Sequence, residues 1–316
     1  MLDIENRDDA VEWLLRRGFA APPDFEVLAG GVSSRTVRVG DIVLKQSLPK
    51  LRVAVDWFSS PDRIHREALA MRHLARIAPP GSITDLLFND TDEHVIAMSA
   101  VPRPHSNWKT MLLSGDVRLE HVHQFGALLR AIHSNSAGLR EVFADKSFFE
   151  TLRVEPYYRY TAHHAPAFFG RLIEETLATN IALVHGDYSP KNVLIHDDRL
   201  VLLDHEVAHF GDPAFDIGFA MAHFLSKAHH LAPSRERFLE AAQEFWRTYG
   251  DDSAEARCVR HSLACLLARV LGRSPLEYLT ADERARQAEA VLAIMVHPPA
   301  GMPEMIERFA KEIACR

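Results

Sequence analysis

One segment of the chain limits the possible folds more than any other, because it places oxygen-bearing side chains at fixed intervals around a short hairpin. Asp187 lies in a loop, and Asn192 comes five residues later, directly before the apolar run 193–195. A second apolar run, 200–203, ends at Asp204. The polar turn between the two runs predicts a hairpin, and antiparallel pairing brings Asn192 and Asp204 to the same end of it.

These three side chains have complementary chemistry. The oxygens of Asn192 and Asp204 suit Mg²⁺, which keeps waters and substrate phosphates as its other ligands. Asp187 then remains to orient or deprotonate a hydroxyl group. Any one of these residues alone is typical of an ordinary turn, but the ordered set predicts a phosphoryl transferase of the kinase type.

The ordered set also resembles a known family. The pattern H-G-D-x-x-x-x-N over 185–192, followed by D-x-E over 204–206, is similar to that of aminoglycoside phosphotransferases and choline kinases, relatives of the protein kinases. Residues 211–218 resemble the D-P-x-x-D stretch of that family, and 125–133 resemble its G-x-x-L-x-x-L-H helix. The resemblance implies an α+β, protein-kinase-like bilobal fold, with a small antiparallel-sheet N-terminal lobe and a larger helical C-terminal lobe.

The resemblance also implies a role for each of these residues. Asp187 would be the catalytic base, Asn192 and Asp204 would hold the metal, and Asp216 would brace the catalytic loop. The cofactors would be ATP and Mg²⁺, and the acceptor an alcohol group of a small molecule. A protein substrate is not expected, because the D-P-x-x-D stretch follows Asp204 too closely for a long peptide-docking loop.

The N-terminal third has the alternating pattern of strands, interrupted by one helical segment at 61–77 and preceded by another at 6–18. Gly30 and Gly31 form a turn between two of the strands, and Ser33 and Ser34 follow it. Backbone N–H groups in such a turn can approach phosphates, although the G-x-G-x-x-G pattern is absent. The expected strands are 25–28, 36–39, 42–46, 84–88 and 94–98.

Two charged residues of this region match the nucleotide site of the kinase fold. Lys45 lies on a predicted strand and matches the ATP-binding lysine, and Glu67 on the following helix matches its ion-pair partner. Met98 and Ala100 belong to the segment whose backbone would bind the adenine edge. We therefore expect Gly30, Gly31, Ser33, Ser34, Lys45, Glu67, Met98 and Ala100 to bind the nucleotide.

After the prolines near 102–104, helical periodicity dominates. The sequence predicts three parts: an N-terminal nucleotide-binding lobe over 1–100, a hinge over 101–107, and a helical catalytic and substrate lobe over 108–316. A cleft between two lobes is a usual place for a ligand site. The expected helices are 119–134, 168–179, 213–228, 234–249, 254–271 and 281–294.

Charge and composition exclude several classes of function. The formal net charge of −7 argues against a nucleic-acid-binding or polybasic membrane-binding protein. No apolar run approaches the ~18 residues of a membrane span, and three cysteines without a C-x-x-C pair indicate a reducing compartment. We expect a soluble, cytoplasmic protein whose partner is a small hydroxylated substrate. The sequence leaves open whether the protein forms a homodimer.

A narrower resemblance is to methylthioribose kinases. Residues 43–49 and 63–68 look like the corresponding segments of those enzymes, and 269–272 resemble part of their C-terminal arginine pair. The chain departs from them in two places. Ala268 stands where the first arginine of the pair would be, and Asn192 stands where those kinases tend to have a serine-containing variant.

The acceptor is expected to be a neutral or anionic hydroxylated metabolite, such as a sugar. Arg269 and Arg273 lie in the region where aminoglycoside kinases need an acid-rich pocket, and an arginine facing the cleft would repel a polyamine. Two alternatives stay open: a catalytically silent nucleotide-binding protein on the same fold, and an aminoglycoside-modifying phosphotransferase. A silent relative tends to lose one of the site residues, whereas Lys45, Asp187 and Asp204 are all present.

Several other residues have a structural interpretation. The adjacent histidines 163–164 and 229–230 suit metal chelation poorly and are expected on the surface. Cys258 and Cys265, seven residues apart on one helix, are expected in the core. Trp57 either anchors the packing of the lobes or contacts the substrate, and packing is the favoured interpretation.

Overall fold

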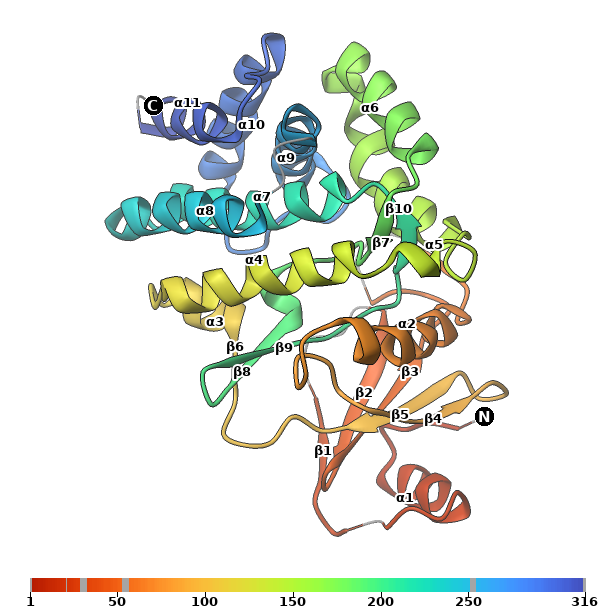
Figure 1. Cartoon of the computed structure of the whole chain (residues 1–316). Helices are drawn as coiled ribbons and strands as arrows, with labels where there is room; N and C mark the ends of the chain where they lie inside the picture. Colours follow the sequence, from red (N-terminus) through yellow and green to blue (C-terminus); the bar gives the residue numbers. More distant parts are fainter. Residues whose placement is uncertain (1, 21, 29–32, 53–56, 251–253, 315–316) are drawn as a thin grey trace.

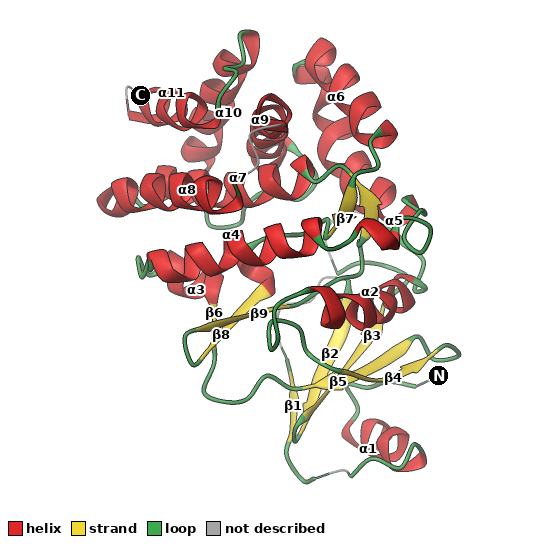
Figure 2. Ribbon diagram, in the orientation of Figure 1, coloured by secondary structure: helices red, strands yellow, loops and turns green. Residues whose placement is uncertain are grey.

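The computed structural model describes residues 2–20, 22–28, 33–52, 57–250 and 254–314 (Figure 1). Strands gather in the N-terminal part of the molecule and helices make up most of the remainder (Figure 2). This agrees with the prediction of a strand-rich N-terminal lobe and a larger helical lobe. The exact limits of the hinge, 101–107, stay a prediction.

The N-terminal lobe is built on a five-stranded antiparallel sheet in the order β1-β2-β3-β5-β4. Alternate residues of β3 face opposite sides of this sheet. Leu44 packs in the cluster that includes Trp13 of the first helix, whereas Val43 packs against the second helix. Lys45 is therefore directed away from the Leu44 cluster. The strands are β1 (Phe25–Val27), β2 (Ser34–Val39), β3 (Ile42–Ser47), β4 (Leu86–Asp90) and β5 (Val95–Ser99).

Two helices cover this sheet, as the sequence predicts. Helix α1 (Arg7–Arg16) begins after Asn6, whose side chain accepts hydrogen bonds from the backbone N–H groups of the first turn. Helix α2 (Arg63–Ile77) packs its apolar face, which includes Ala68 and Met71, against the sheet. Arg66, in the first turn of this helix, reaches the other lobe and pairs with Asp145 at 2.9 Å.

The C-terminal lobe is organised around the buried helix α7 (Ala214–His230). Helices α7 and α9 cross so closely at Gly218 that an added Cβ would lie 2.5 Å from the backbone carbon of His261. Cys258 and Cys265 are buried in this core, as predicted. The other predicted helices are α4 (Leu119–Ser134), α6 (Pro166–Ala178), α8 (Arg235–Tyr249), α9 (Glu255–Leu271) and α10 (Ala281–Val296).

Short strands place the predicted catalytic loop between the lobes. The predicted hairpin is confirmed as β8–β9, with Val193 opposite Leu202. The sheet that contains this hairpin has one strand more than expected, because β6 also pairs with β8. The short strands are β6 (Ser106–Asn107), β7 (Ala182–Val184), β8 (Val193–His196), β9 (Arg199–Leu202) and β10 (His209–Gly211).

Some elements were not anticipated. The most consequential is a wide π-helical segment, Glu150–Arg159, which follows the short α5 (Ser147–Phe149) and contains Pro156. Helices α3 (Trp108–Leu113) and α11 (Met302–Ala314) were also missed. The expectation for 229–230 was wrong, because His229 is 5% exposed and packs within the C-terminal lobe.

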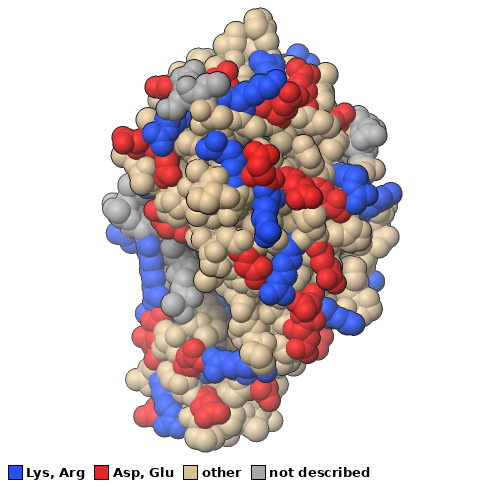
Figure 3. Space-filling model, turned by 90° about the vertical axis from the view of Figure 1, so that its left-hand side faces the viewer, with Lys and Arg blue, Asp and Glu red and all other residues tan. Residues whose placement is uncertain are grey.

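The surface fits the composition. On the face seen in Figure 3, basic and acidic side chains are interspersed over much of the area. Among the residues that the structure describes, no helix is both long and apolar enough to cross a membrane.

Candidate active site

Lys45 lies at the centre of the charged groups between the lobes. Its Nζ is 2.6 Å from Glu67 Oε2 on α2 and 2.6 Å from Asp204 Oδ1 after β9. Helical spacing explains the first contact, because Glu67 lies on the same face of α2 as the apolar residues that pack on the sheet. Asp204 reaches the lysine from a left-handed backbone conformation, with φ of +67°.

Burial and mutual attraction set the protonation of this group. Burial alone would lower the pKa of Lys45, but Asp204 and Glu67 together hold it above its usual range. Burial likewise favours the neutral form of Asp204, yet Lys45 holds the pKa of that carboxyl below its usual range. Burial raises the pKa of Glu67 to about 7, against the opposing effect of Lys45. Two carboxylates thus compete for one ammonium group.

Asp216 fixes the backbone ahead of Asp187. Its two oxygens accept hydrogen bonds from the backbone N–H of His185 at 2.6 Å and of Gly186 at 2.8 Å. Gly186 has φ of +78°, which glycine adopts readily. Burial would raise the pKa of Asp216, but the hydrogen bond from His133 lowers it, so the carboxylate stays charged. Asp216 therefore braces the loop that ends at Asp187.

Asp187 itself is held through one oxygen. Asn192 Nδ2 donates to Asp187 Oδ2 at 2.8 Å, and Arg153 Nη2 lies 3.0 Å from the same atom. Arg153 also donates to the backbone carbonyl of Gly186 at 2.6 Å. These contacts orient the carboxylate and leave Asp187 Oδ1 without a hydrogen-bond partner within the described ranges.

Asn192 and Asp204 are brought together only through the backbone. The N–H of Leu203 donates to the carbonyl of Asn192 at 2.8 Å, while the Asn192 amide nitrogen turns to Asp187. The carboxylates whose oxygens lie within 4.8 Å of one another are instead Asp204, Glu67 and Glu206. Such a set of hard oxygen donors fits a divalent cation.

Glu206 is held by a buried arginine. Arg63 Nε lies 3.1 Å from Glu206 Oε2, and the Arg63 side chain is fully buried. The same guanidinium donates to the backbone carbonyls of Ser33 and Leu48. Arg63 therefore ties the C-terminal lobe to the end of the turn that the sequence assigns to phosphate binding.

The structure describes some of the residues predicted to bind the nucleotide and not others. Gly30 and Gly31 lie outside the described residues, whereas Ser33 and Ser34 are buried at the start of β2. The N–H of Ala100 already donates to the carbonyl of Asp41 at 2.8 Å. That N–H is therefore engaged within the protein. Met98 is buried on β5, and its sulfur accepts a hydrogen bond from the Thr84 hydroxyl at 3.7 Å.

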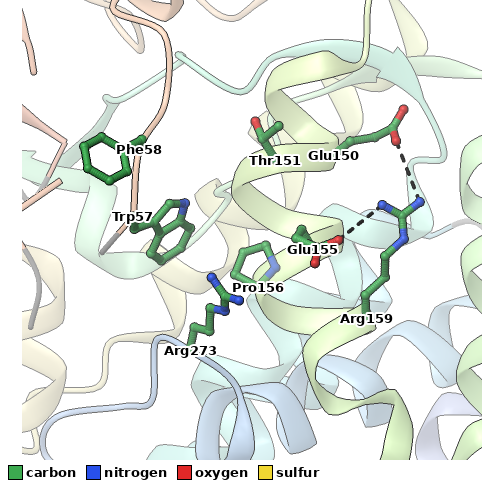
Figure 4. Close-up of a pocket in the computed structure, with 8 residues that line it drawn as sticks. All are labelled: Trp57, Phe58, Glu150, Thr151, Glu155, Pro156, Arg159 and Arg273. Atoms are coloured by element: carbon green, nitrogen blue, oxygen red, sulfur yellow. Dashed lines mark hydrogen bonds and ion pairs between the residues drawn. The ribbon is translucent and has the colours of Figure 1, made fainter. Parts of the chain in front are cut away.

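The two arginines that were predicted to contact the substrate have different surroundings. Arg273 is exposed and lines a cavity of about 320 Å³ beside Trp57 and Pro156 (Figure 4). Within the described residues, Arg273 makes no ion pair, whereas Arg159 in the same cavity pairs with Glu155 at 3.3 Å. Arg269 does not line this cavity. Its guanidinium donates to the hydroxyl of Tyr157 at 3.0 Å and to Ser274. Trp57 packs against the core of the C-terminal lobe as expected and also faces this cavity.

A buried lysine on α7 stands near this arginine. Lys227 is fully buried, and its Nζ lies 3.3 Å from the carbonyl of His223 and 5.3 Å from the centre of the Tyr278 ring. It forms no ion pair within the part of the chain that the structure describes. Burial, together with the positive charges of Lys109 and Arg269, lowers the pKa of Lys227 to about 7.

Lys227→Met is expected to stabilise the protein at pH 7 by an amount on the order of 3 kcal/mol. The unfolded chain binds this proton up to a pKa of 10.5 and the folded chain only up to about 7, so folding becomes more favourable as pH rises between these values. The advantage of the variant should therefore shrink by pH 9.5. Urea denaturation at both pH values measures this, with the exposed Lys311→Met as control; an equal gain at both pH values would contradict the assignment.

Sequence reasoning missed Arg153, Arg63 and Glu206 as site residues. Two of them could have been found in the sequence. Glu206 completes the D-x-E pattern, and Arg63 lies four residues before Glu67 on the same predicted helix. Arg153 could not have been found in this way, because it belongs to a helix that the sequence did not predict.

The comparisons with known proteins agree with this geometry. A profile of the phosphotransferase enzyme family (APH) matches residues 24–258. The methylthioribose kinase of Pectobacterium atrosepticum is 23% identical over 294 residues, covering 77% of this chain and 73% of that protein. The methylthioribose kinase of Yersinia pseudotuberculosis is 22% identical over 292 residues, covering 76% of this chain and 71% of that protein.

Solved structures share the fold at low identity. A choline/ethanolamine kinase family protein from Mesorhizobium loti superposes with a TM-score of 0.59 at 16% identity, covering all of both chains. The GDP complex of aminoglycoside 2′-phosphotransferase-IIIa has a TM-score of 0.53 at 12% identity, covering 97% of this chain and 98% of that one. The chain therefore belongs to the phosphotransferase enzyme family and is a kinase-like, small-molecule phosphotransferase.

Proposed function

We propose that the protein transfers the γ-phosphoryl group of ATP to a hydroxyl group of a small metabolite, with Asp187 as the catalytic base. The observation that carries this proposal is the arrangement around Asp187. Asn192 and Arg153 both contact Oδ2, which leaves Oδ1 to accept the proton of an acceptor hydroxyl. A base held in this way needs no reorientation when the acceptor binds.

Nucleotide binding is assigned to the groups that converge on Lys45. Lys45 would contact the α- and β-phosphates, and Glu67 would position it. Ser33 and Ser34, with Gly30 and Gly31, would bring backbone N–H groups to the phosphates.

At the adenine edge, Met98 would pack against the base. The carbonyl of Ala100 and the N–H of Val101 would form the hydrogen bonds, because the N–H of Ala100 is already engaged.

Asp204 and Asn192 would hold Mg²⁺, with Glu206 close by. When bound, Mg²⁺ neutralises charge on the transferring phosphoryl group. The residues of this chain contribute the rest: Lys45 keeps Asp204 ionised, and Arg153 keeps Asp187 aimed.

The acceptor is proposed to be a neutral or anionic hydroxylated metabolite, such as a sugar. Arg273 and the Trp57 ring line one cavity between the lobes, where a sugar face can stack on the ring and a hydroxyl or carboxylate can meet the guanidinium. The charged residues of the cavity are Arg159, Arg273, Glu150 and Glu155, so its lining has no excess of negative charge to hold a polycationic acceptor. The similarity to methylthioribose kinases supports the same class.

A coupled assay of ATP consumption tests this proposal. Sugars, hydroxy acids and kanamycin-like polyamines are offered at equal concentration, with Arg273→Gln as a matched variant. We expect turnover of a sugar or hydroxy acid and a raised KM in the variant. Turnover of polyamines alone would contradict the acceptor class. Nucleotide binding without turnover of any acceptor would favour the silent alternative.

A further inference from the structure

A second cluster of metal-binding side chains lies in the N-terminal lobe, outside the groups that converge on Lys45. Asp62 immediately precedes α2, His65 lies in the first turn of that helix, and His94 lies in the turn between β4 and β5. The candidate ligand atoms of the three residues all lie within 4.8 Å of one another. None of the three has a place in the proposed phosphoryl transfer.

The spacing of these atoms matches a tetrahedral metal. His65 Nε2 lies 3.1 Å from His94 Nδ1, and His94 Nδ1 lies 3.5 Å from Asp62 Oδ1. Zinc binds nitrogen and oxygen ligands at about 2.0–2.2 Å, which places neighbouring ligands of a tetrahedron about 3.3 Å apart. The two distances lie on either side of this value.

The surroundings orient the ligands. His65 Nδ1 lies 2.8 Å from the amide oxygen of Asn89, an acceptor, so the proton sits on Nδ1 and the lone pair of Nε2 faces His94. Metal-binding histidines usually have such a partner on their other nitrogen. The hydroxyl of Ser60 donates to Asp62 Oδ2 at 2.9 Å, which leaves Oδ1 free to face the histidines.

The backbone of His94 has an unusual conformation in the turn between β4 and β5. Its φ of +49° lies in the left-handed region, which residues other than glycine rarely adopt. Strain of this kind is retained where surrounding contacts require it, often at binding sites. Without a metal, the same groups form only a hydrogen-bonded chain from Asn89 through the two histidines.

We propose that Asp62, His65 and His94 bind one divalent transition-metal ion, with zinc favoured by the nitrogen-rich ligand set and a water molecule in the fourth position. The metal would fasten the first turn of α2 to the β4–β5 turn. Arg63 and Glu67 lie on the same helix, so the ion would restrain the helix that carries them. The proposal does not depend on the proposed function.

Zinc titration of the metal-free, untagged full chain tests the site. Isothermal calorimetry should give one tight equivalent of zinc. His94→Gln should weaken this binding at least about tenfold, and Asn89→Ala should weaken it by about tenfold by releasing His65. Zinc should raise the melting temperature of the wild type and leave that of His94→Gln unchanged. Cobalt should give the absorption of a tetrahedral site.

The exposed pair His163 and His164 provides the control, because its rings lie 3.9 Å apart without belonging to the cluster. The variant His163→Gln, His164→Gln should bind zinc like the wild type. Equal loss in this control, or unchanged binding in His94→Gln, would overturn the site, as would the absence of tight binding. If His94→Gln does not fold, the exposed Asp62→Asn takes its place and should weaken binding in the same direction.

Discussion

Asp187→Ala is expected to lower turnover by at least about a hundredfold while leaving binding of the magnesium nucleotide nearly unchanged. Asp187 is assigned to the acceptor hydroxyl, and the nucleotide contacts are assigned to Lys45 and Asp204 in the same cleft. Single-turnover kinetics measure the chemical step, and calorimetry with a non-hydrolysable nucleotide measures binding.

Two further variants serve as controls for this prediction. Asp187→Asn retains the shape beside Arg153 and should lose activity to a similar degree, which separates loss of the base from loss of structure. Asp197→Asn removes an exposed charge of the nearby β8–β9 turn, keeps a residue that tolerates its positive φ, and should behave like the wild type. If Asp187→Ala had a turnover rate close to that of the wild type, Asp187 would not be the catalytic base.

Asp204→Asn is expected to raise the Mg²⁺ concentration needed for half-maximal rate by about tenfold or more, because it removes charge from the metal site. Saturating Mg²⁺ should restore the rate in part. The same substitution weakens the 2.6 Å contact with Lys45, so nucleotide binding should also decline. Rate as a function of Mg²⁺ concentration measures the effect.

Asp198→Asn provides the matched control for this substitution, because Asp198 is exposed in the same hairpin and should leave the Mg²⁺ dependence unchanged. An unchanged Mg²⁺ dependence in Asp204→Asn, together with normal nucleotide binding, would show that Asp204 is not a ligand.

The parts of the site that follow local rules could be predicted from sequence. The Asp187 loop is set by a glycine with positive φ and by a hairpin whose two apolar runs are visible in the chain. The pairing of Lys45 with Glu67 follows from strand and helix periodicity combined with the family resemblance. Hairpin pairing brings the backbones of Asn192 and Asp204 to one end, as expected, but it does not fix the rotamer of Asn192, whose amide contacts Asp187.

The remaining contacts depend on tertiary packing. Arg153 reaches Asp187 from a π-helical segment, and no simple periodicity marks a helix that is wider than 3.6 residues per turn. The burial of Lys227 and His229 depends on helices that surround α7 on several sides, so one helix pattern cannot reveal it. Helix α11, by contrast, has a clear apolar face and could have been predicted.

The ion pairs that link the two lobes differ in how they respond to solvent. Arg66 bridges the lobes to an exposed aspartate, where dissolved salt screens the attraction. Arg63 and Glu206, in contrast, are buried away from the solvent, so salt affects their contact little. Lys45 and Asp204 meet in the space assigned to the phosphates. High ionic strength should therefore weaken the contact of Arg66 with Asp145 and leave that of Arg63 with Glu206 nearly unchanged. Under the proposed function, a bound nucleotide would replace the contact between Lys45 and Asp204.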